Sequence, residues 1–215
     1  MLDVHPPHEP IHGWRDFLLH ILTITIGLLI ALTLEAAVER LHHRHIVAEA
    51  RENIRHEIED NQKLIAGDHK SIDEDSRQMR VNMAVLRTLR QNPHSHGSMS
   101  LSWSWSAPNA SAWSAARDTG ALALMPYAAA QSYADLYGQQ QLVNEQAILL
   151  FRNQTKASVP MMIEADSATP AQIDEALHRC AETIVDLAVL NDFLKGLDQS
   201  YEAALKSSRT APPVN

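Results

Sequence analysis

Several of the twelve histidines stand at spacings that metal sites use. Glu39-Arg-Leu-His42 and Glu175-Ala-Leu-His178 both follow the pattern Glu-x-x-His. On a helix this spacing places a carboxylate and an imidazole on one face, as in bundles that bind two iron ions. A complete site also needs two further glutamates at core depth, and an isolated pair arises easily by chance. A di-metal carboxylate enzyme is therefore one alternative, and solvated histidines at a helix rim are the simpler interpretation.

Eight of the twelve histidines, His42 among them, stand in three short groups. One group is His5, His8 and His12, and another is His94 and His96. Both stand in segments without fixed geometry, so neither group predicts a metal site. The third group follows an apolar run and is called here the basic collar: Arg40, His42, His43, Arg44 and His45. Histidines charge near neutral pH, so the collar could respond to pH on anionic lipid headgroups. The alternative is an ordinary basic flank that sets membrane topology.

Nucleophilic and nucleotide chemistry have little support. The chain has one cysteine, Cys180, on the apolar face of a predicted helix, where cysteine is usually an inert small hydrophobe. Phosphate-binding, dinucleotide-binding and Gly-x-Ser-x-Gly motifs do not occur. The net charge of −8 argues against a nucleic-acid partner. Trp103, Trp105 and Trp113 could form a ligand-facing surface, but such residues more often belong to a core or an interface. We expect no enzyme activity, cofactor or metal site.

The element that dominates the N-terminal part is an apolar run from Phe17 to Leu34, which contains no Asp, Glu, Lys or Arg. Eighteen helical residues span about 27 Å, close to the thickness of a hydrocarbon core. Trp14 and Arg15 suit the membrane interface at one end, and the basic collar suits it at the other. A cleaved signal peptide would begin with Lys or Arg, which the leader lacks. The run therefore predicts a retained transmembrane helix over 14–38.

Small residues recur along this helix at Thr23, Gly27 and Ala31. Such a track lets two helix backbones approach closely and predicts a contact face for a second copy or a partner membrane protein. The alternative is that Thr and Gly are simply common in membrane helices. Lys and Arg near the span are concentrated on its C-terminal side, which predicts a cytoplasmic C-terminal domain.

The remainder reads as amphipathic helices with short connections. An apolar stripe of helical period runs from Val47 to Ile65 and is expected to stop at Gly67. A second helix is expected from Asp68 or Ser71 to Asn92. The segment that follows alternates Leu101, Trp103 and Trp105 with serines, which predicts a short strand that pairs elsewhere, or an ordered loop.

Three more helices are expected after this segment. Asn109 can cap a short helix that Thr119-Gly120 closes, and Pro126 suits the first turn of a long helix to about Thr155. Thr169, Pro170 and Gln172 form a capping box before the last helix. The fold class is therefore all-α: a flexible leader over 1–13, the transmembrane helix over 14–38, an antiparallel helical bundle over 39–207 with a short irregular or strand-like Trp/Ser segment, and a disordered tail over 208–215.

The chain resembles a group of uncharacterised bacterial single-pass membrane proteins. The matching features are the span with its exit, the helix that ends Glu57-Ile-Glu-Asp-Asn61, and the stretch from Trp113 to Gly120 with Tyr133 and Tyr137 after it. They cover about half of the chain, imply a single-pass protein of the bacterial inner membrane, and supply no catalytic residues. We expect a non-enzymatic scaffold or signal-relay module in contact with the lipid bilayer; an extracytoplasmic ligand-sensing bundle is the alternative.

Overall fold

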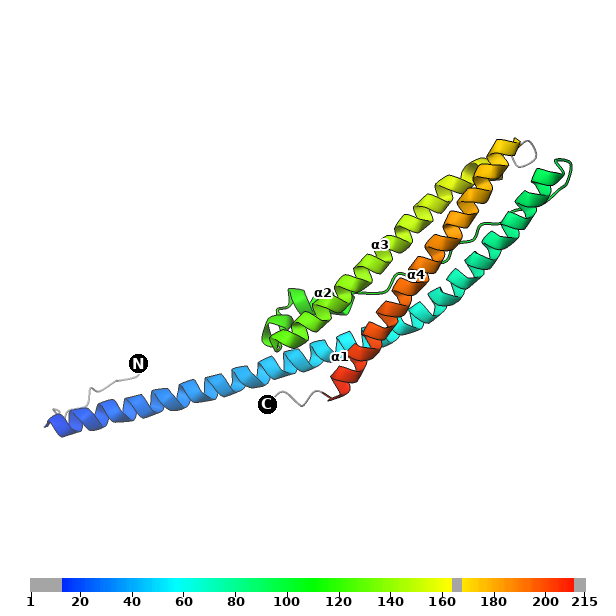
Figure 1. The fold of residues 1–215 in the computed structure, drawn as a ribbon. Helices are drawn as coiled ribbons and strands as arrows, with labels where there is room; N and C mark the ends of the chain where they lie inside the picture. Colours follow the sequence, from blue (N-terminus) through cyan, green and yellow to red (C-terminus); the bar gives the residue numbers. More distant parts are fainter. Residues whose placement is uncertain (1–12, 164–167, 211–215) are drawn as a thin grey trace, which may run out of the picture. The chain divides into compact units, whose positions relative to one another are not determined.

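The computed structural model describes residues 13–163 and 168–210, and within them it is helical without strands. The elements are α1 (Trp14–Gln91), α2 (Ser111–Asp118), the short 3-10 helix η1 (Ala121–Leu124), α3 (Tyr127–Ile163) and α4 (Pro170–Thr210) (Figure 1). The chain divides into two compact units between Ile46 and Val47. The predicted leader before Gly13, with His5, His8 and His12, and the tail beyond Thr210 lie outside the described residues.

The first unit consists of α1 from Trp14 to Ile46. Among the described residues, α1 is the helix with a stretch long and apolar enough to cross a membrane, and none of that stretch is buried. The hydroxyls of Thr23, Thr25 and Thr33 donate to backbone carbonyls three or four residues earlier. These polar groups therefore have partners within their own helix, as a lipid environment requires.

In the second unit, α1 continues from Val47 to Gln91 without a break, so the predicted stop at Gly67 is wrong. A glycine inside a helix costs only about 1 kcal/mol relative to alanine. Here the buried positions keep one seven-residue phase through Gly67, with Ile58, Ile65 and Ile72 all in the core. Burial of this continuous stripe outweighs the local preference of one glycine. The separate helix predicted from Asp68 or Ser71 is thus the second half of α1.

The second half of α1 lies beside α3 and α4 (Figure 1). Glu57 and Asn61 meet Tyr137 and Gln140, so α1 and α3 run in the same direction. Along α4 the order is reversed, because Gln62 meets Asp198, His69 meets Asn191 and Arg90 meets Asp174: α1 and α4 run antiparallel. The core between the three helices is apolar and includes these fully buried side chains: Ile54, Ile58, Ile65, Leu86, Leu187, Leu194, Leu197 and Tyr201.

α1 and α3 are parallel because the chain returns along α1 in an extended segment, Met99–Asn109, instead of a helix (Figure 1). The predicted strand is therefore wrong, and the ordered loop is what the structure contains. The alternation itself is preserved: Leu101, Trp103 and Trp105 are half-buried, and the serines between them are exposed. Trp103 packs against Phe151, and Trp105 Nε1 donates to Asn144 of α3.

Two predicted helix boundaries rest on local signals that the structure confirms. Thr169 N–H donates to Gln172 Oε1 at 2.8 Å and the hydroxyl of Thr169 accepts from Gln172 N–H, which confirms the capping box of α4. Gly120 closes α2 with φ +78°, a left-handed conformation that favours glycine. The predicted end of α3 at about Thr155 is wrong, because the helix continues through Pro160 to Ile163. A proline near a helix end removes one hydrogen bond without ending the helix.

Candidate functional site

A row of buried polar side chains faces the extended segment from α1. Asn61, Asp68, Asp75 and Asn82 follow one another at intervals of seven residues, and each is at most 5% exposed. Seven residues are close to two helical turns, so the four side chains share one face of the helix. We call them the polar row. Each member binds Met99–Asn109, in reversed order along the chain.

The two amides at the ends of the polar row bind the segment's backbone as a paired strand would. Asn61 Oδ1 accepts from the N–H of Asn109 at 2.7 Å, and its Nδ2 donates to the Asn109 carbonyl at 2.8 Å. Asn82 does the same with Ser100, at 3.2 and 2.8 Å. An amide carries a donor and an acceptor side by side, so one side chain satisfies both backbone groups of one residue.

The two carboxyls in the middle of the row are only half satisfied. Asp68 Oδ1 accepts from Ser106 N–H at 3.0 Å, and Asp75 Oδ1 accepts from the Ser102 hydroxyl at 3.2 Å. The second oxygen of each is buried and has no hydrogen-bond partner. Burial raises the pKa of both carboxyls, and the single hydrogen bond offsets only part of that effect.

Glu57 lies one turn before the row and is fully bonded. Its Oε2 accepts from the Ser111 hydroxyl and the Ala112 N–H, and its Oε1 accepts from the Trp113 N–H and the Tyr137 hydroxyl. The carboxylate thus sits at the N-terminus of α2, where the helix dipole and free N–H groups favour an anion. Ala110, the residue in the capping position, offers no side-chain bond, so Glu57 of α1 caps α2 from outside.

Aromatic side chains pack beside Glu57 and Asn61. The rings of Trp113 and Tyr137 stack with centroids 5.2 Å apart. Burial, and then the bond to Glu57, raise the pKa of Tyr137, so its phenol stays protonated and donates. Tyr201 of α4 donates to Gln140, which also accepts from Asn61 and donates to the Asn109 carbonyl at 2.9 Å. Buried side chains from α1, α3 and α4 therefore converge on one residue of the extended segment.

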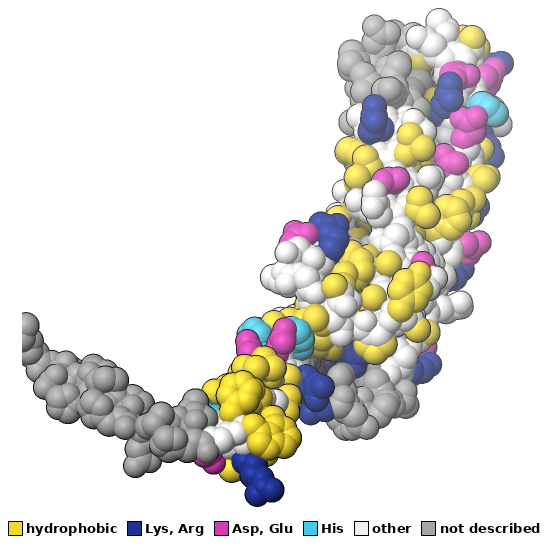
Figure 2. Space-filling model, turned by 90° about the vertical axis from the view of Figure 1, so that its left-hand side faces the viewer, with side chains coloured by type: hydrophobic (Ala, Val, Ile, Leu, Met, Phe, Trp, Pro, Cys, Tyr) yellow, Lys and Arg dark blue, Asp and Glu magenta, His cyan; other side chains and the backbone are white. Residues whose placement is uncertain are grey.

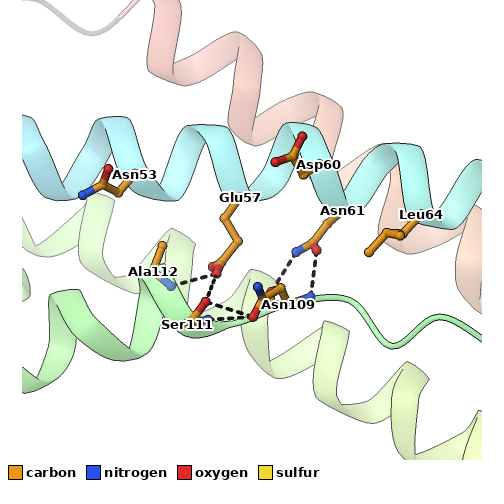
Figure 3. A pocket seen from close by; sticks show the side chains of 8 residues that line it. All are labelled: Asn53, Glu57, Asp60, Asn61, Leu64, Asn109, Ser111 and Ala112. Atoms are coloured by element: carbon orange, nitrogen blue, oxygen red, sulfur yellow. Dashed lines mark hydrogen bonds between the residues drawn. The ribbon is translucent and has the colours of Figure 1, made fainter.

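An open hollow of about 510 Å³ lies over this network. Figure 3 shows Glu57 and Asn61 pointing from α1 toward Asn109 and Ser111, whereas Asp60 points away from them. The other lining residues are Asn53, Leu64 and Ala112. Glu57 has no unused acceptor facing the hollow, and Asp60 is paired with Lys63 at 2.7 Å. The hollow offers the side-chain amides of Asn53 and Asn109 and one hydroxyl, that of Ser111, to a polar ligand, and its carboxylates already have partners.

Residues predicted for the membrane are exposed along the first unit. Thr23, Gly27 and Ala31 all face outward, and a Cβ added at Gly27 would meet nothing within 4 Å. Their use as a contact face remains a prediction. The predicted interface residues are at least partly exposed as well: Trp14, Arg15, Arg40, His42, His43 and Arg44. Within the basic collar, His43 lies 3.9 Å from Glu39.

The two Glu-x-x-His pairs lie outside the core. Glu175 binds Arg179 at 2.8 Å, and His178 lies 3.2 Å from Glu182, so each pairs four residues onward along α4 and remains well exposed. No group of three or more potential metal ligands occurs in the part of the chain that the structure describes. Cys180 packs against the apolar cluster of Leu86, Leu89, Ile173 and Ala176, as predicted, and burial raises its thiol pKa.

A second surface stands out for its apolar side chains. α3 and α4 leave several large hydrophobic side chains half-exposed: Leu142, Ile148, Leu149, Val185, Val189 and Phe193. Leu149, Val189 and Phe193 border a small hollow of about 130 Å³ between these helices. Figure 2 shows that hydrophobic side chains remain exposed on the surface of the second unit. We call the α3/α4 group the apolar face.

Comparisons with protein-family models, curated proteins and solved structures found no match to this chain.

The polar row and the role of Glu57 were not predicted from the sequence. The row was readable as a seven-residue repeat of Asn or Asp in phase with the isoleucines, because polar residues at core positions of a helix need buried partners. Glu57 carried no such signal, since its partners come from two distant parts of the chain, the start of α2 and α3.

Proposed function

We propose that the chain is a single-pass protein of the bacterial inner membrane, related to the group that it resembles, whose second unit acts as a scaffold or signal-relay module. The observation that carries the membrane part is the fully exposed apolar stretch of α1, whose three threonine hydroxyls bond to their own helix. In water, exposure of so many large apolar side chains would be costly. Insertion into a bilayer removes that cost.

The apolar face supports action by contact with another protein. Three of its exposed side chains, Leu149, Val189 and Phe193, lie together at a hollow between two packed helices, and exposed apolar groups of this kind commonly mark interaction sites. The buried polar groups nearest the large hollow support a structural function, because Glu57 and Asn61 are already used in holding the extended segment and α2. Packed helices with exposed apolar side chains on α3 and α4 support this proposal of a scaffold.

Membrane insertion and topology are tested together. We expect the full chain to stay in the membrane fraction after alkaline carbonate washing. A C-terminal fusion should be active with a cytoplasmic reporter and inactive with a periplasmic one, because the basic residues flank the C-terminal side of the span. Release by carbonate would contradict the anchor. A periplasmic C-terminus would instead favour the second candidate, a ligand-sensing bundle, for which the polar hollow of about 510 Å³ is the supporting feature.

Self-association through the first unit has its own test. Gly27→Leu should lower the signal of a membrane two-hybrid assay at least severalfold, because the added side chain separates two backbones that would otherwise touch. Leu29→Ala, on another side of the same helix, serves as the matched control and should leave the signal unchanged. Equal signals from Gly27→Leu and the unsubstituted chain would exclude this contact face.

Contact through the apolar face is tested by a photo-crosslinking amino acid at Phe193, which is 47% exposed. We expect a covalent adduct with another protein or a second copy in intact cells. The same probe at Lys195, on the same helix but turned away from Phe193, should give none. If the two positions give the same pattern, the apolar face has no specific partner.

A further inference from the structure

The four residues of the polar row differ in how fully they are hydrogen-bonded. The amides at its two ends satisfy both backbone groups of Asn109 and Ser100. The carboxyls between them satisfy one group each and keep one buried oxygen without a partner. An ionised carboxylate can accept about four hydrogen bonds, and Glu57 on the same helix receives four. Asp68 and Asp75 are therefore poorly matched to a charged state.

Protonation corrects this mismatch. A protonated carboxyl has a hydroxyl donor beside a carbonyl acceptor, which is the same arrangement that an amide offers. In that form Asp68 and Asp75 resemble the asparagines at the two ends of the row, and the oxygen that now lacks a partner can donate to an acceptor in the segment. Losing the proton returns a buried charge with a single hydrogen bond, which is costly.

We propose that Asp68 and Asp75 make Met99–Asn109 a proton-dependent strap, held against α1 when both carboxyls are protonated and loosened when they ionise. The segment passes between helices without forming regular secondary structure, so its hold depends on side chains of the polar row and on its own tryptophans. The end amides keep the strap in register, and the two carboxyls determine whether its middle stays bound.

Few charged or titratable groups face these two carboxyls. The electrostatic neighbours that act on them are His69 for Asp68 and Glu74 for Asp75, both on α1. The strap has no charged residue. α3 meets it through the uncharged Asn144, and α4 meets this part of α1 through the uncharged Asn191. Two acids of α4 contact other residues of α1: Asp174 binds Arg90, and Asp198 accepts from Gln62.

The direction of the pH effect follows from the buried state. Burial raises the pKa of Asp68 and Asp75 above the value in an unfolded chain. In the folded protein these two carboxyls therefore keep their protons to a higher pH. The stabilisation is thus complete at low pH and is lost as the pH rises through the raised pKa. Asp186 of α4 also has a pKa raised by burial, but it borders the apolar face and contacts no residue of the strap in the bonds described above.

The test is hydrogen exchange of the full chain in lipid nanodiscs, with rates corrected for the intrinsic effect of pH. In the unsubstituted chain we expect amides of the strap to exchange about tenfold faster at pH 8 than at pH 4.5, because ionisation removes the hydrogen bonds that the protonated carboxyls donate and the loss of one such bond corresponds to about this factor at most. The double variant Asp68→Asn with Asp75→Asn should be protected at both pH values. Asp73→Asn, an exposed neighbour on α1, is the matched control and should keep the pH dependence.

Three results would overturn the strap. The first is equal corrected exchange at the two pH values in the unsubstituted chain. The second is a pH dependence that persists in the double variant, and the third is loss of helical circular dichroism in that variant, because an amide would then not replace the protonated carboxyl. Acrylamide quenching of the tryptophan emission gives a second reading, since Trp103 and Trp105 lie on the strap and should become more accessible as it loosens.

Discussion

Glu57→Gln is the most direct single test of the polar network, because it replaces one carboxylate oxygen by an amide nitrogen and preserves the shape of the side chain. Each carboxylate oxygen accepts one hydroxyl and one backbone N–H. An amide nitrogen in place of either oxygen therefore faces an N–H that cannot turn away, from Ala112 or from Trp113. The hydroxyls of Ser111 and Tyr137 can rotate to accept instead, so only part of the network recovers.

The expected loss follows from these atoms. A buried N–H without an acceptor costs about 1–3 kcal/mol, and removal of a negative charge from a helix N-terminus costs about 0.3–1 kcal/mol. Glu57 is only 8% exposed, so the cost of a buried unpaired group applies to most of its contacts. We expect Glu57→Gln to lower the free energy of unfolding of the second unit by about 2–4 kcal/mol. Glu74→Gln, on an exposed position of the same helix, should change it by less than about 0.5 kcal/mol.

The assay is urea unfolding of the full chain in mild detergent, followed by tryptophan emission and circular dichroism. Tyr137→Phe completes a double-mutant cycle with Glu57→Gln, and the two changes should be non-additive by at least about 0.5 kcal/mol because they share one hydrogen bond. An effect of Glu57→Gln no larger than that of Glu74→Gln would refute the view that this carboxylate caps α2. Strict additivity with Tyr137→Phe would refute the shared bond.

Two further predictions test the backbone and the end of the polar row by the same assay. Gly67→Ala should raise the free energy of unfolding by about 0.5–1 kcal/mol, since a Cβ there meets nothing and the helix is continuous. Gly120→Ala should lower it by about 1–2 kcal/mol, because its φ is +78° although space is open, and effects of equal sign at the two glycines would contradict the assigned backbone. Asn61→Ala should cost about 2–3 kcal/mol, since both backbone groups of Asn109 lose a partner, and the exposed Asn53→Ala should cost less than about 0.5 kcal/mol. A similar loss from both asparagine variants would mean that Asn61 does not hold the extended segment.

Much of the helical content could be predicted because its signals are local. The apolar stripes of α1 and α4, the capping box at Thr169 and the left-handed closure at Gly120 each depend on residues a few positions apart. Gly67 shows the limit of this reasoning. Its local preference predicts a helix end, but the cost of one glycine is small compared with a buried stripe that continues on both sides.

The extended segment shows a second limit. Alternation of Leu101, Trp103 and Trp105 correctly predicts one half-buried face, because alternation needs only an extended chain. It cannot say what satisfies the backbone. A strand would find its partners on another strand, whereas here the partners are side chains of a helix that ends eight residues before the segment begins. Pairing between such elements depends on tertiary structure.

The polar row and the extended segment explain each other. A fourth helix in this position would satisfy its own backbone, and α1 could then have presented isoleucines at all of its core positions. An extended chain leaves N–H and C=O groups pointing sideways into a space between helices, where water is largely excluded. Those groups need partners at intervals set by the segment, and Asn61, Asp68 and Asn82 supply them from α1. Asp75, in the same seven-residue phase, binds the hydroxyl of Ser102 instead. The row is thus a requirement of the fold, and the choice of two carboxyls where amides would suffice is the feature that makes it sensitive to protons.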